Sequence, residues 1–365
     1  MIIDACGKHG LHEEALLHYG DLCNSGLELN VVSYCSIISA MVNVGKYKKA
    51  EHLYRRAQLK GIRTDLHLHL KMIHCYTKCK KTRLGHEIYS LIQKLRMKMT
   101  STAYSTVLAL YVEGAWYNHA ASTLKHLEIE GISLDRSAHG LLIRAFGSIK
   151  DNMAPLIKAV EASQYDVCRL LTSLSLTREE GPKWSPTWIR LVKEYIERIE
   201  GDDADSQSIL GIYNAFLDCF WQRGLKQAAK ILLEEARKDC AVSTCPKIYE
   251  TELVLDIRGL SVGGSKVAVA EWLNDVRKST REDFLDGKKM VIITGVGSFP
   301  NMFEGELAYS QRKGLKAALL HLFEELDSPF AEAPENPTVV EASTVDVFEW
   351  ISRVLKRETA LVDCF

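Results

Sequence analysis

The sequence predicts a mainly α-helical protein, in which a solenoid of helix pairs precedes a small α/β domain. Two observations predict this architecture. Apolar helical segments recur with a period of 35 residues over residues 31–135, and such a period is typical of solenoids, whose repeats bury their apolar faces against one another. After Lys247 the pattern changes to strands that alternate with helices. We therefore expect a solenoid over residues 1–246 and an α/β domain over residues 247–365.

The clear repeats are three consecutive blocks of 35 residues, Val31–Asp65, Leu66–Thr100 and Ser101–Asp135. In each block an apolar helix runs to a turn, marked by Gly45 or Gly114 in two of them. A second helix with small residues at its middle follows, and it ends near a Gly-Ile pair. The small residues are Ala50, Ala120 and Ala121, and the closing pairs are Gly61-Ile62 and Gly131-Ile132.

Further copies flank these blocks. Residues 1–30 contain the turn and second helix of an earlier copy, so we expect the chain to begin within a repeat. A fifth copy begins at Arg136 and degenerates over residues 136–205, where a proline and a polar stretch interrupt the pattern. A helix pair with a turn at Gly224 returns over residues 206–240.

The α/β domain is predicted to contain two buried strands, short edge strands and three helices. We expect buried strands at 250–259 and 288–297, edge strands within 328–342, and helices at 263–279, 311–326 and 344–357.

Charge is distributed unevenly, although the formal net charge is only -1. Residues 31–100 hold fifteen Lys and Arg against three acids, a local excess of twelve positive charges. Neutralisation of phosphates requires such an excess, whereas a protein-binding solenoid has no general need of it. The charge therefore favours RNA as the partner of the repeats, with a protein-binding scaffold as the alternative.

The ten cysteines are scattered, mostly within apolar helices, which is typical of reduced thiols. No apolar run reaches the length of roughly twenty residues that crosses a bilayer, and the first residues have a helical pattern rather than that of a transit peptide. His67, His69, His74, Cys75 and Cys79 lie close together in sequence, but their spacing matches no common zinc site. We interpret them as packing and surface residues and expect no bound metal there.

The repeats resemble pentatricopeptide repeats, on the 35-residue period, the tyrosines near helix starts (Tyr34, Tyr104) and the closing Gly-Ile pairs. The resemblance implies a right-handed solenoid that binds single-stranded RNA at about one base per repeat. The fifth and last residues of each repeat would read the base. These residues are Cys35 with Asp65, Leu70 with Thr100, Ser105 with Asp135, and Gly140 in the fifth copy.

Among these pairs, Ser105 with Asp135 resembles the combination that prefers guanine, because a hydroxyl and a carboxylate can both bond to a base edge. Cys35 and Leu70 cannot form the two-way hydrogen bonds that distinguish bases. The sequence thus predicts RNA binding with modest base readout.

Two motifs near strand ends, LDIRGLS at Leu255–Ser261 and ITGVGS at Ile293–Ser298, resemble the signatures of small MutS-related (Smr) domains. The family is associated with nucleic-acid binding and, in some members, endonuclease activity. The resemblance implies Asp256 and Arg258 as catalytic candidates. It also implies a phosphate site at Thr294, Gly295, Gly297 and Ser298, where backbone N–H groups form an anion nest.

The first motif departs from the family pattern, because Arg258 stands where the family usually has histidine. Arginine stays protonated near neutral pH and cannot shuttle a proton. Cleavage would then require Asp256 as a general base or as a ligand of Mg²⁺; no other cofactor is expected. Alternatively, Asp256 only caps the turn after its strand, and the domain protects RNA or recruits factors without catalysis.

The combined resemblance is to plant proteins that join pentatricopeptide repeats to an Smr domain. It implies action in plastids or mitochondria on transcript processing, stability or translation, together with organellar ribonucleoprotein factors and away from membranes. The sequence names neither the target RNA nor the organelle.

Overall fold

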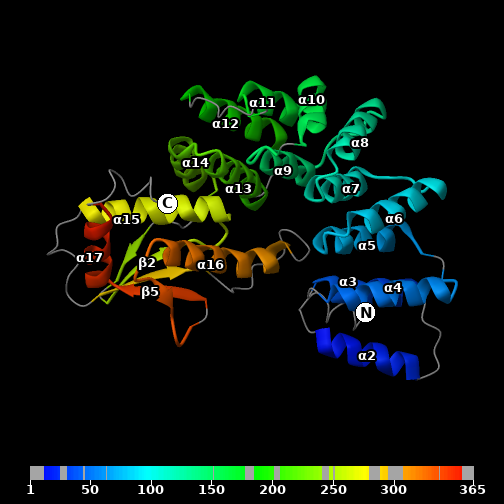
Figure 1. Ribbon diagram of the computed structural model, residues 1–365, viewed down its shortest axis with the longest axis horizontal. Helices are drawn as coiled ribbons and strands as arrows, with labels where there is room; N and C mark the ends of the chain where they lie inside the picture. The colour runs from blue at the N-terminus through cyan, green and yellow to red at the C-terminus, as the bar shows by residue number, and fades with distance from the viewer. Residues whose placement is uncertain are drawn as a thin grey trace. The chain divides into compact units, whose positions relative to one another are not determined.

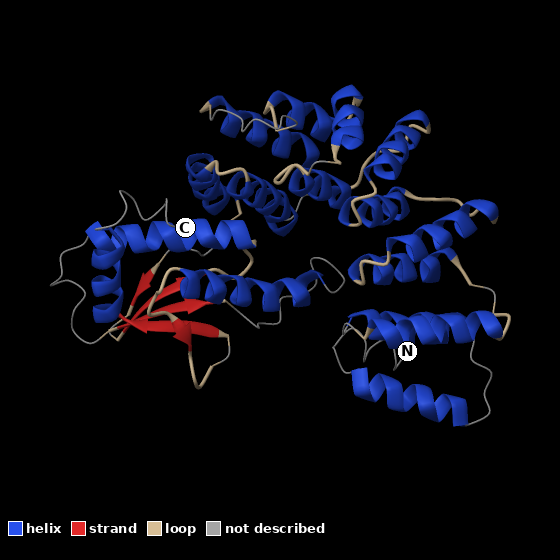
Figure 2. Ribbon diagram, in the orientation of Figure 1, coloured by secondary structure: helices blue, strands red, loops and turns tan. Residues whose placement is uncertain are grey.

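The computed structural model folds into helices with one five-stranded sheet (Figures 1 and 2). It describes residues 12–24, 31–43, 46–62, 64–150, 152–176, 185–200, 206–240, 246–249, 251–278, 288–294, 307–336 and 338–355. The chain divides into two compact units, residues 1–139 with 150–165, and residues 140–149 with 166–365.

The first unit repeats the same helix lengths at the predicted period. The first helices of the pairs are α3 Val31–Asn43, α5 Leu66–Lys78 and α7 Ser101–Glu113, and the second helices are α2 His12–Asn24, α4 Tyr47–Leu59, α6 Thr82–Lys94 and α8 Tyr117–Ile129. Each of these helices has 13 residues. Successive first helices begin at 31, 66 and 101, and α9 Arg136–Ala145 begins at the next expected position. The mainly helical fold class is therefore confirmed, and these helix starts coincide with the starts of the predicted blocks, while the right-handed winding stays a prediction.

Most of these helices end in the same backbone turn. A residue in the left-handed conformation follows the second helices at Gly61 (φ 67°), Arg96 (φ 50°) and Gly131 (φ 65°), which are 35 residues apart. The next residue donates its N–H to the helix, as Ile62 does to the Ala57 carbonyl at 3.1 Å. This hydrogen bond belongs to the Schellman motif, which satisfies carbonyl groups at the helix end. Glycine adopts the conformation without strain, and Arg96 does not.

The core of the first unit depends on small residues at the middle of the second helices. Ala50 and Ala120 are fully buried, and Gly85 occupies the equivalent position in α6. A Cβ atom on Gly85 would lie 2.6 Å from Leu110 of α7, so the absence of a side chain permits the close approach of neighbouring repeats. The predicted small residues are thus packing residues.

Beyond α9 the helices lose the regular spacing. The remaining helices are α10 Ala154–Ala162, α11 Asp166–Ser173, α12 Thr187–Glu200, α13 Ser206–Gln222 and α14 Lys226–Asp239. The predicted pair over 206–240 corresponds to α13 and α14, whose connection contains Gly224 at φ 71°.

The sheet follows α14 in the order β1-β2-β3-β5-β4. Its strands are β1 Lys247–Ile248, β2 Glu252–Asp256, β3 Lys289–Ile293, β4 Ala331–Glu332 and β5 Val339–Ser343, and its helices are α15 Val262–Lys278, α16 Leu307–Glu325 and α17 Thr344–Leu355. β2 and β3 are parallel, joined through α15, and the other pairs are antiparallel.

One strand prediction needs correction. β5 lies inside the sheet between β3 and β4, whereas the sequence suggested that both strands of 328–342 were edges. The prolines Pro329, Pro334 and Pro337 all fall before β5, so its N–H groups remain available for both neighbours. The short β1, which pairs with β2, was not predicted.

Candidate nucleic-acid interface

The fifth and last residues of the repeats come together across 30 positions of sequence. The Ser105 hydroxyl donates to Oδ1 of Asp135 at 2.7 Å, and the Cys35 thiol donates to Oδ1 of Asp65 at 3.7 Å. Each partner on the first helix is its fifth residue, so two equivalent sites are built in the same way. The sequence-predicted pairs are therefore spatial neighbours.

Each aspartate also caps the start of the next helix. Oδ1 of Asp65 accepts the Leu68 N–H at 2.8 Å, and Oδ1 of Asp135 accepts the Ala138 N–H at 2.8 Å. These are N-cap hydrogen bonds, which satisfy donors at a helix start. One oxygen of each carboxylate thus fixes its orientation, while Oδ2 bonds to no described residue. A carboxylate held in this way presents an acceptor to an incoming N–H donor, such as those of guanine or uracil.

The intervening pair is chemically different. Leu70 is half-buried, and the Thr100 hydroxyl accepts the Ala103 N–H at 3.2 Å as the N-cap of α7. Gly140 is buried in α9 and has no side chain to offer. The carboxylate acceptors therefore occur only at the Asp65 and Asp135 positions of the predicted readout set.

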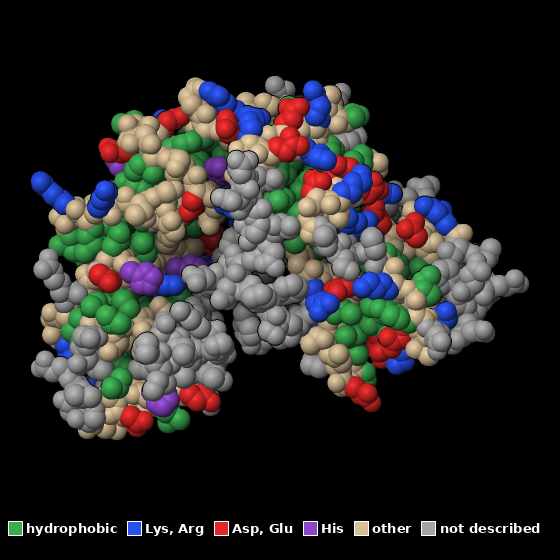
Figure 3. All heavy atoms as spheres, turned by 180° about the vertical axis from the view of Figure 1, so that it is seen from behind, with side chains coloured by type: hydrophobic (Ala, Val, Ile, Leu, Met, Phe, Trp, Pro, Cys, Tyr) green, Lys and Arg blue, Asp and Glu red, His purple; other side chains and the backbone are tan. Residues whose placement is uncertain are grey.

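The basic residues of 31–100 lie mainly on second helices and turns. First helices contribute only Lys71 and Lys78, both half-buried, and Lys78 lies 3.9 Å from Glu113. Most others are exposed, and some pair with acids, as Lys81 does with Glu51 at 2.8 Å. In the view of Figure 3 the Lys and Arg side chains are spread among other types. The residue count over 31–100 gave the excess of positive charge, but it did not predict how that charge is distributed between the two helices of a pair.

His69 belongs to the core rather than to a metal site. It is fully buried, with Nδ1 2.9 Å from the Tyr54 hydroxyl and Nε2 3.1 Å from the Thr64 hydroxyl. Burial lowers the pKa of His69 below its usual value of 6.5, against the opposing charge of Asp65. The pKa of His69 is lower in the folded state than in the unfolded state. Neutral His69 therefore contributes fully to the stability of the fold above pH 6.5, and this contribution is lost as the pH falls below that value. Among the described residues, no cluster of three or more His, Cys, Asp or Glu could hold a metal ion.

The first motif of the α/β domain and the described start of the second, Ile293 and Thr294, lie at one end of the sheet. Asp256 is in register with Ile293, and the Ile257 N–H donates to the Ile293 carbonyl at 3.2 Å. The strands are parallel, so their carboxyl ends lie together, as in many α/β ligand sites. Thr294 directly follows β3 and therefore lies beside the first motif.

Asp256 and Arg258 bind each other. The Arg258 Nε donates to the carboxylate at 2.8 Å, and the Arg258 backbone N–H donates to Oδ1 at 3.0 Å. The second bond is an Asx-type turn, which accounts for an aspartate at a strand end. The carboxylate raises the pKa of Arg258 further, so that side chain remains a cation. A metal ion at Asp256 would have to displace the guanidinium.

Of the predicted phosphate-binding residues, Thr294 alone is described. It is buried, and its hydroxyl donates to the Thr338 carbonyl at 2.9 Å, so it stabilises the end of the sheet. Gly295, Gly297 and Ser298 lie outside the described residues.

Residues of α13 that the sequence did not single out hold the first motif in place. Asn214 accepts the Ser261 N–H at 2.8 Å and donates to the Gly259 carbonyl at 2.7 Å. Asp218 accepts the Gly263 N–H at 2.8 Å. These two residues are one helical turn apart and bind the loop from β2 to α15. The i, i+4 spacing of two polar residues in an apolar helix was the available signal.

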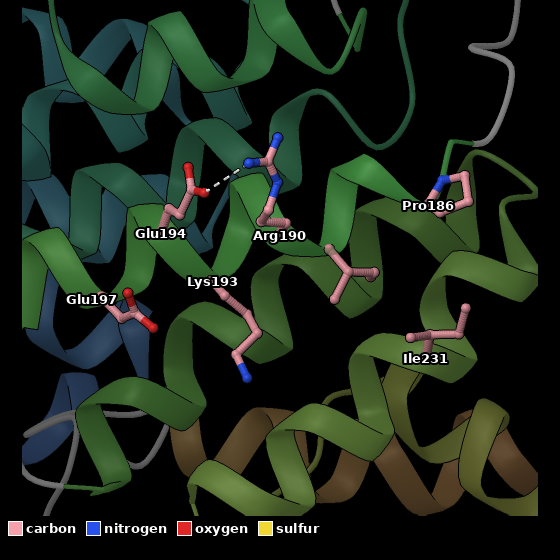
Figure 4. A pocket seen from close by; sticks show the side chains of 7 residues that line it. Pro186, Arg190, Lys193, Glu194, Glu197 and Ile231 are labelled. Atoms are coloured by element: carbon pink, nitrogen blue, oxygen red, sulfur yellow. Dashed lines mark ion pairs between the residues drawn. The ribbon is translucent and has the colours of Figure 1, made fainter.

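A hollow beside α12 and α14 is lined largely by charged side chains, of which Arg190 and Glu194 pair with each other (Figure 4). Lys193 bonds to Glu235 at 2.5 Å, and Arg190 lies 3.6 Å from Glu194. Hydrogen bonding to Glu235 raises the pKa of Lys193. These charges neutralise one another, so the hollow does not extend the interface. No helix in the described ranges has the length and apolar composition needed to span a bilayer.

The repeated helix pairs define a helical-repeat protein. Two family models match its N-terminal part: "PPR repeat" over residues 1–27 and "Pentatricopeptide repeat domain" over residues 19–57.

The chain is similar to two pentatricopeptide repeat-containing proteins of Arabidopsis thaliana. One, described as chloroplastic, is 25% identical over 261 residues, which make up 69% of this chain and 16% of that protein. The other is 34% identical over 67 residues, 18% of this chain and 9% of that protein. The chain thus spans less than a fifth of either relative.

Solved structures of the pentatricopeptide repeat protein PPR10 are also similar. The maize protein matches with a TM-score of 0.35 and 15% identity, covering 89% of this chain and 43% of that one. PPR10 in complex with an 18-nt psaJ RNA element matches with a TM-score of 0.35 and 13% identity, covering 89% and 52%.

Proposed function

We propose that the protein binds single-stranded RNA through its repeats, with the Ser105–Asp135 pair reading one base. The main support is that the same geometry occurs at two repeats. In each, the next helix and the fifth residue of the repeat fix a carboxylate through Oδ1, while Oδ2 bonds to no described residue. Fixed acceptors at equivalent positions two repeats apart suit a strand whose bases follow at a regular spacing. The excess of positive charge in 31–100 adds attraction to phosphates that does not depend on base sequence.

Asp135→Asn is the test that separates base reading from folding. Asparagine caps helices about as well as aspartate, so the fold should persist. Its amide can place a donor where Oδ2 accepted, and one lost bidentate base contact costs about 1–3 kcal/mol, or roughly ten-fold in Kd. Fluorescence anisotropy with oligonucleotides that differ at one position should show the weakening only for the base that the wild-type protein prefers.

Asp275→Asn is the matched control, because that carboxylate lies on α15 and is 72% exposed. It should leave base preference unchanged. Equal preference in wild type and Asp135→Asn would refute base reading at this pair. Binding that is insensitive to salt would point instead to a protein-binding scaffold, since phosphate contacts weaken steeply as salt rises.

We infer that the biological setting is an organelle, a plastid or a mitochondrion, where the protein would act with ribonucleoprotein factors on RNA processing, stability or translation. The chloroplastic description of the relative with 25% identity supports this setting. Import of the full-length protein fused to a fluorescent reporter tests it, and purely cytosolic fluorescence would contradict it.

We further propose that the α/β domain is Smr-like and contacts RNA near Asp256, because its first motif and the described start of its second lie at the carboxyl ends of adjacent parallel strands. Cleavage is the second activity to test, with Mg²⁺ supplied and with Asp256→Ala beside the wild type. Cleavage lost in the variant would assign a nuclease. Binding without cleavage in both proteins would assign a protecting or recruiting domain.

A further inference from the structure

Trp221 stands apart from the other described tryptophans of the second unit. Trp188, Trp272 and Trp350 are at most 6% exposed and belong to the core, whereas Trp221 at the end of α13 is only partly buried. A partly exposed indole is held by packing yet retains a surface for a ligand.

Two ammonium groups from different helices converge on this ring. Nζ of Lys226, the first residue of α14, lies 5.6 Å from the ring centroid, and Nζ of Lys266 on α15 lies 5.9 Å from it. Both distances are within the range of cation–π interaction. Three helices therefore contribute one group each to a single cluster, which we call the Trp221 cluster: Trp221, Lys226 and Lys266.

Neighbouring cations on the same two helices are neutralised, in contrast to Lys266. Glu271 lies 3.0 Å from Arg237 and 3.8 Å from Lys230. Lys266 forms no ion pair with any carboxylate of the described residues, and Asp218, the acid of α13, accepts the Gly263 N–H. An anion beside Lys266 would supply the opposite charge that no described carboxylate supplies there.

We propose that the Trp221 cluster is a second contact for single-stranded RNA, in which the indole stacks on a nucleobase and the two lysines bind the flanking phosphates. A π surface with adjacent cations is the combination that proteins use for single strands without sequence preference. An acidic peptide would use the cations but has no need of the ring. The proposal rests on the proposed RNA-binding function and adds a site outside the repeats that carry the base-reading pairs.

The position of the cluster supports a continuous path with the first α/β motif. Asn214, Asp218 and Trp221 are spaced i, i+4 and i+7, so they share one face of α13. The first two bind the loop that follows the motif, and Trp221 lies one turn further along. A strand stacked on Trp221 would therefore lie beside the loop that leads from Arg258 to α15.

The test uses the full chain and a labelled 15-nucleotide single-stranded RNA of mixed sequence. Trp221→Ala should raise Kd by about ten-fold, because one stacked base contributes on that order, whereas Trp221→Phe should keep most of the affinity. The double variant Lys226→Gln/Lys266→Gln should lower the slope of log K against log salt by about two, one for each lost phosphate contact. Lys278→Gln is the matched control, on the same helix and 62% exposed, and should leave affinity and slope nearly unchanged.

The outcomes separate this inference from the proposed function. RNA binding by the wild type that all Trp221 cluster variants retain would overturn the inference and leave the repeats as the binding site. Absence of RNA binding by the wild type would overturn both. Equal weakening by Trp221→Ala and Trp221→Phe, or displacement of RNA by polyglutamate but not by a second single strand, would overturn the stacked-base assignment. Thermal unfolding of each variant confirms that the comparison is between folded proteins.

Discussion

Gly114→Ala tests the packing that places neighbouring repeats in register. Gly114 ends α7, and a Cβ atom there would lie 2.1 Å from the Thr82 hydroxyl oxygen and 2.7 Å from its methyl carbon. Thr82 is buried at the start of α6, so it cannot swing into solvent. Overpacking of this kind costs about 1–3 kcal/mol, and the reduced freedom of the unfolded chain returns about 0.4–1 kcal/mol. We expect a net loss of about 1–2 kcal/mol in the free energy of unfolding.

Urea unfolding followed by circular dichroism measures this loss. Thr82→Ala removes both close atoms, so Gly114→Ala should cost less in that background, with a coupling of about 1 kcal/mol in the double-mutant cycle. Gly140→Ala is the matched control, because the nearest atom to its Cβ is the flexible Arg144 Nη1 at 3.2 Å. Alanine inside a helix should there be neutral or stabilising. Additive effects at Gly114 and Thr82, or a stable Gly114→Ala protein, would refute the packing argument.

Three further substitutions test other features. Ala115→Gly should raise the free energy of unfolding by about 1 kcal/mol, because Ala115 has φ 58°; an unchanged urea midpoint would contradict this. His69→Tyr introduces the residue that stands at the equivalent position 34. In the wild type, protonation of buried His69 should lower the free energy of unfolding between pH 7.5 and pH 5.5, and the variant should lose less over that range. Identical pH profiles of the two proteins would exclude His69 as the source. Glu271→Gln should destabilise the second unit, because Arg237 loses its charged partner at 3.0 Å; the melting temperature should fall, and Glu271→Asp should be milder.

The pattern along the sequence was sufficient for the helices α3 to α8. Glycines at 61 and 131 and small residues at 50, 85 and 120 occupy equivalent positions of the repeats, and both features act through local geometry. The equivalent turn at Arg96 lacks the glycine signal, so only the regular period indicated it. The parallel strands β2 and β3 were also predictable, since fully buried strands have continuous apolar runs.

The candidate site was likewise predictable from the sequence only in part. The resemblance to pentatricopeptide repeats, applied in the 35-residue register, paired Ser105 with Asp135 and Cys35 with Asp65 as the fifth and last residues of a repeat. That only one oxygen of each aspartate is engaged required the tertiary structure, since helix capping and a side chain from the preceding repeat meet at that atom.

By itself the sequence determined what is periodic or local: the repeat length, the helix ends, the excess of charge and the two strand-end motifs. Only the tertiary structure decided which groups share a surface. It placed most of the basic charge on the second helices and the turns, β5 inside the sheet, and Trp221 beside lysines from two other helices. The physical reason is that these neighbours come from separate elements, whose packing depends on side-chain shape across the whole unit rather than on spacing along the chain.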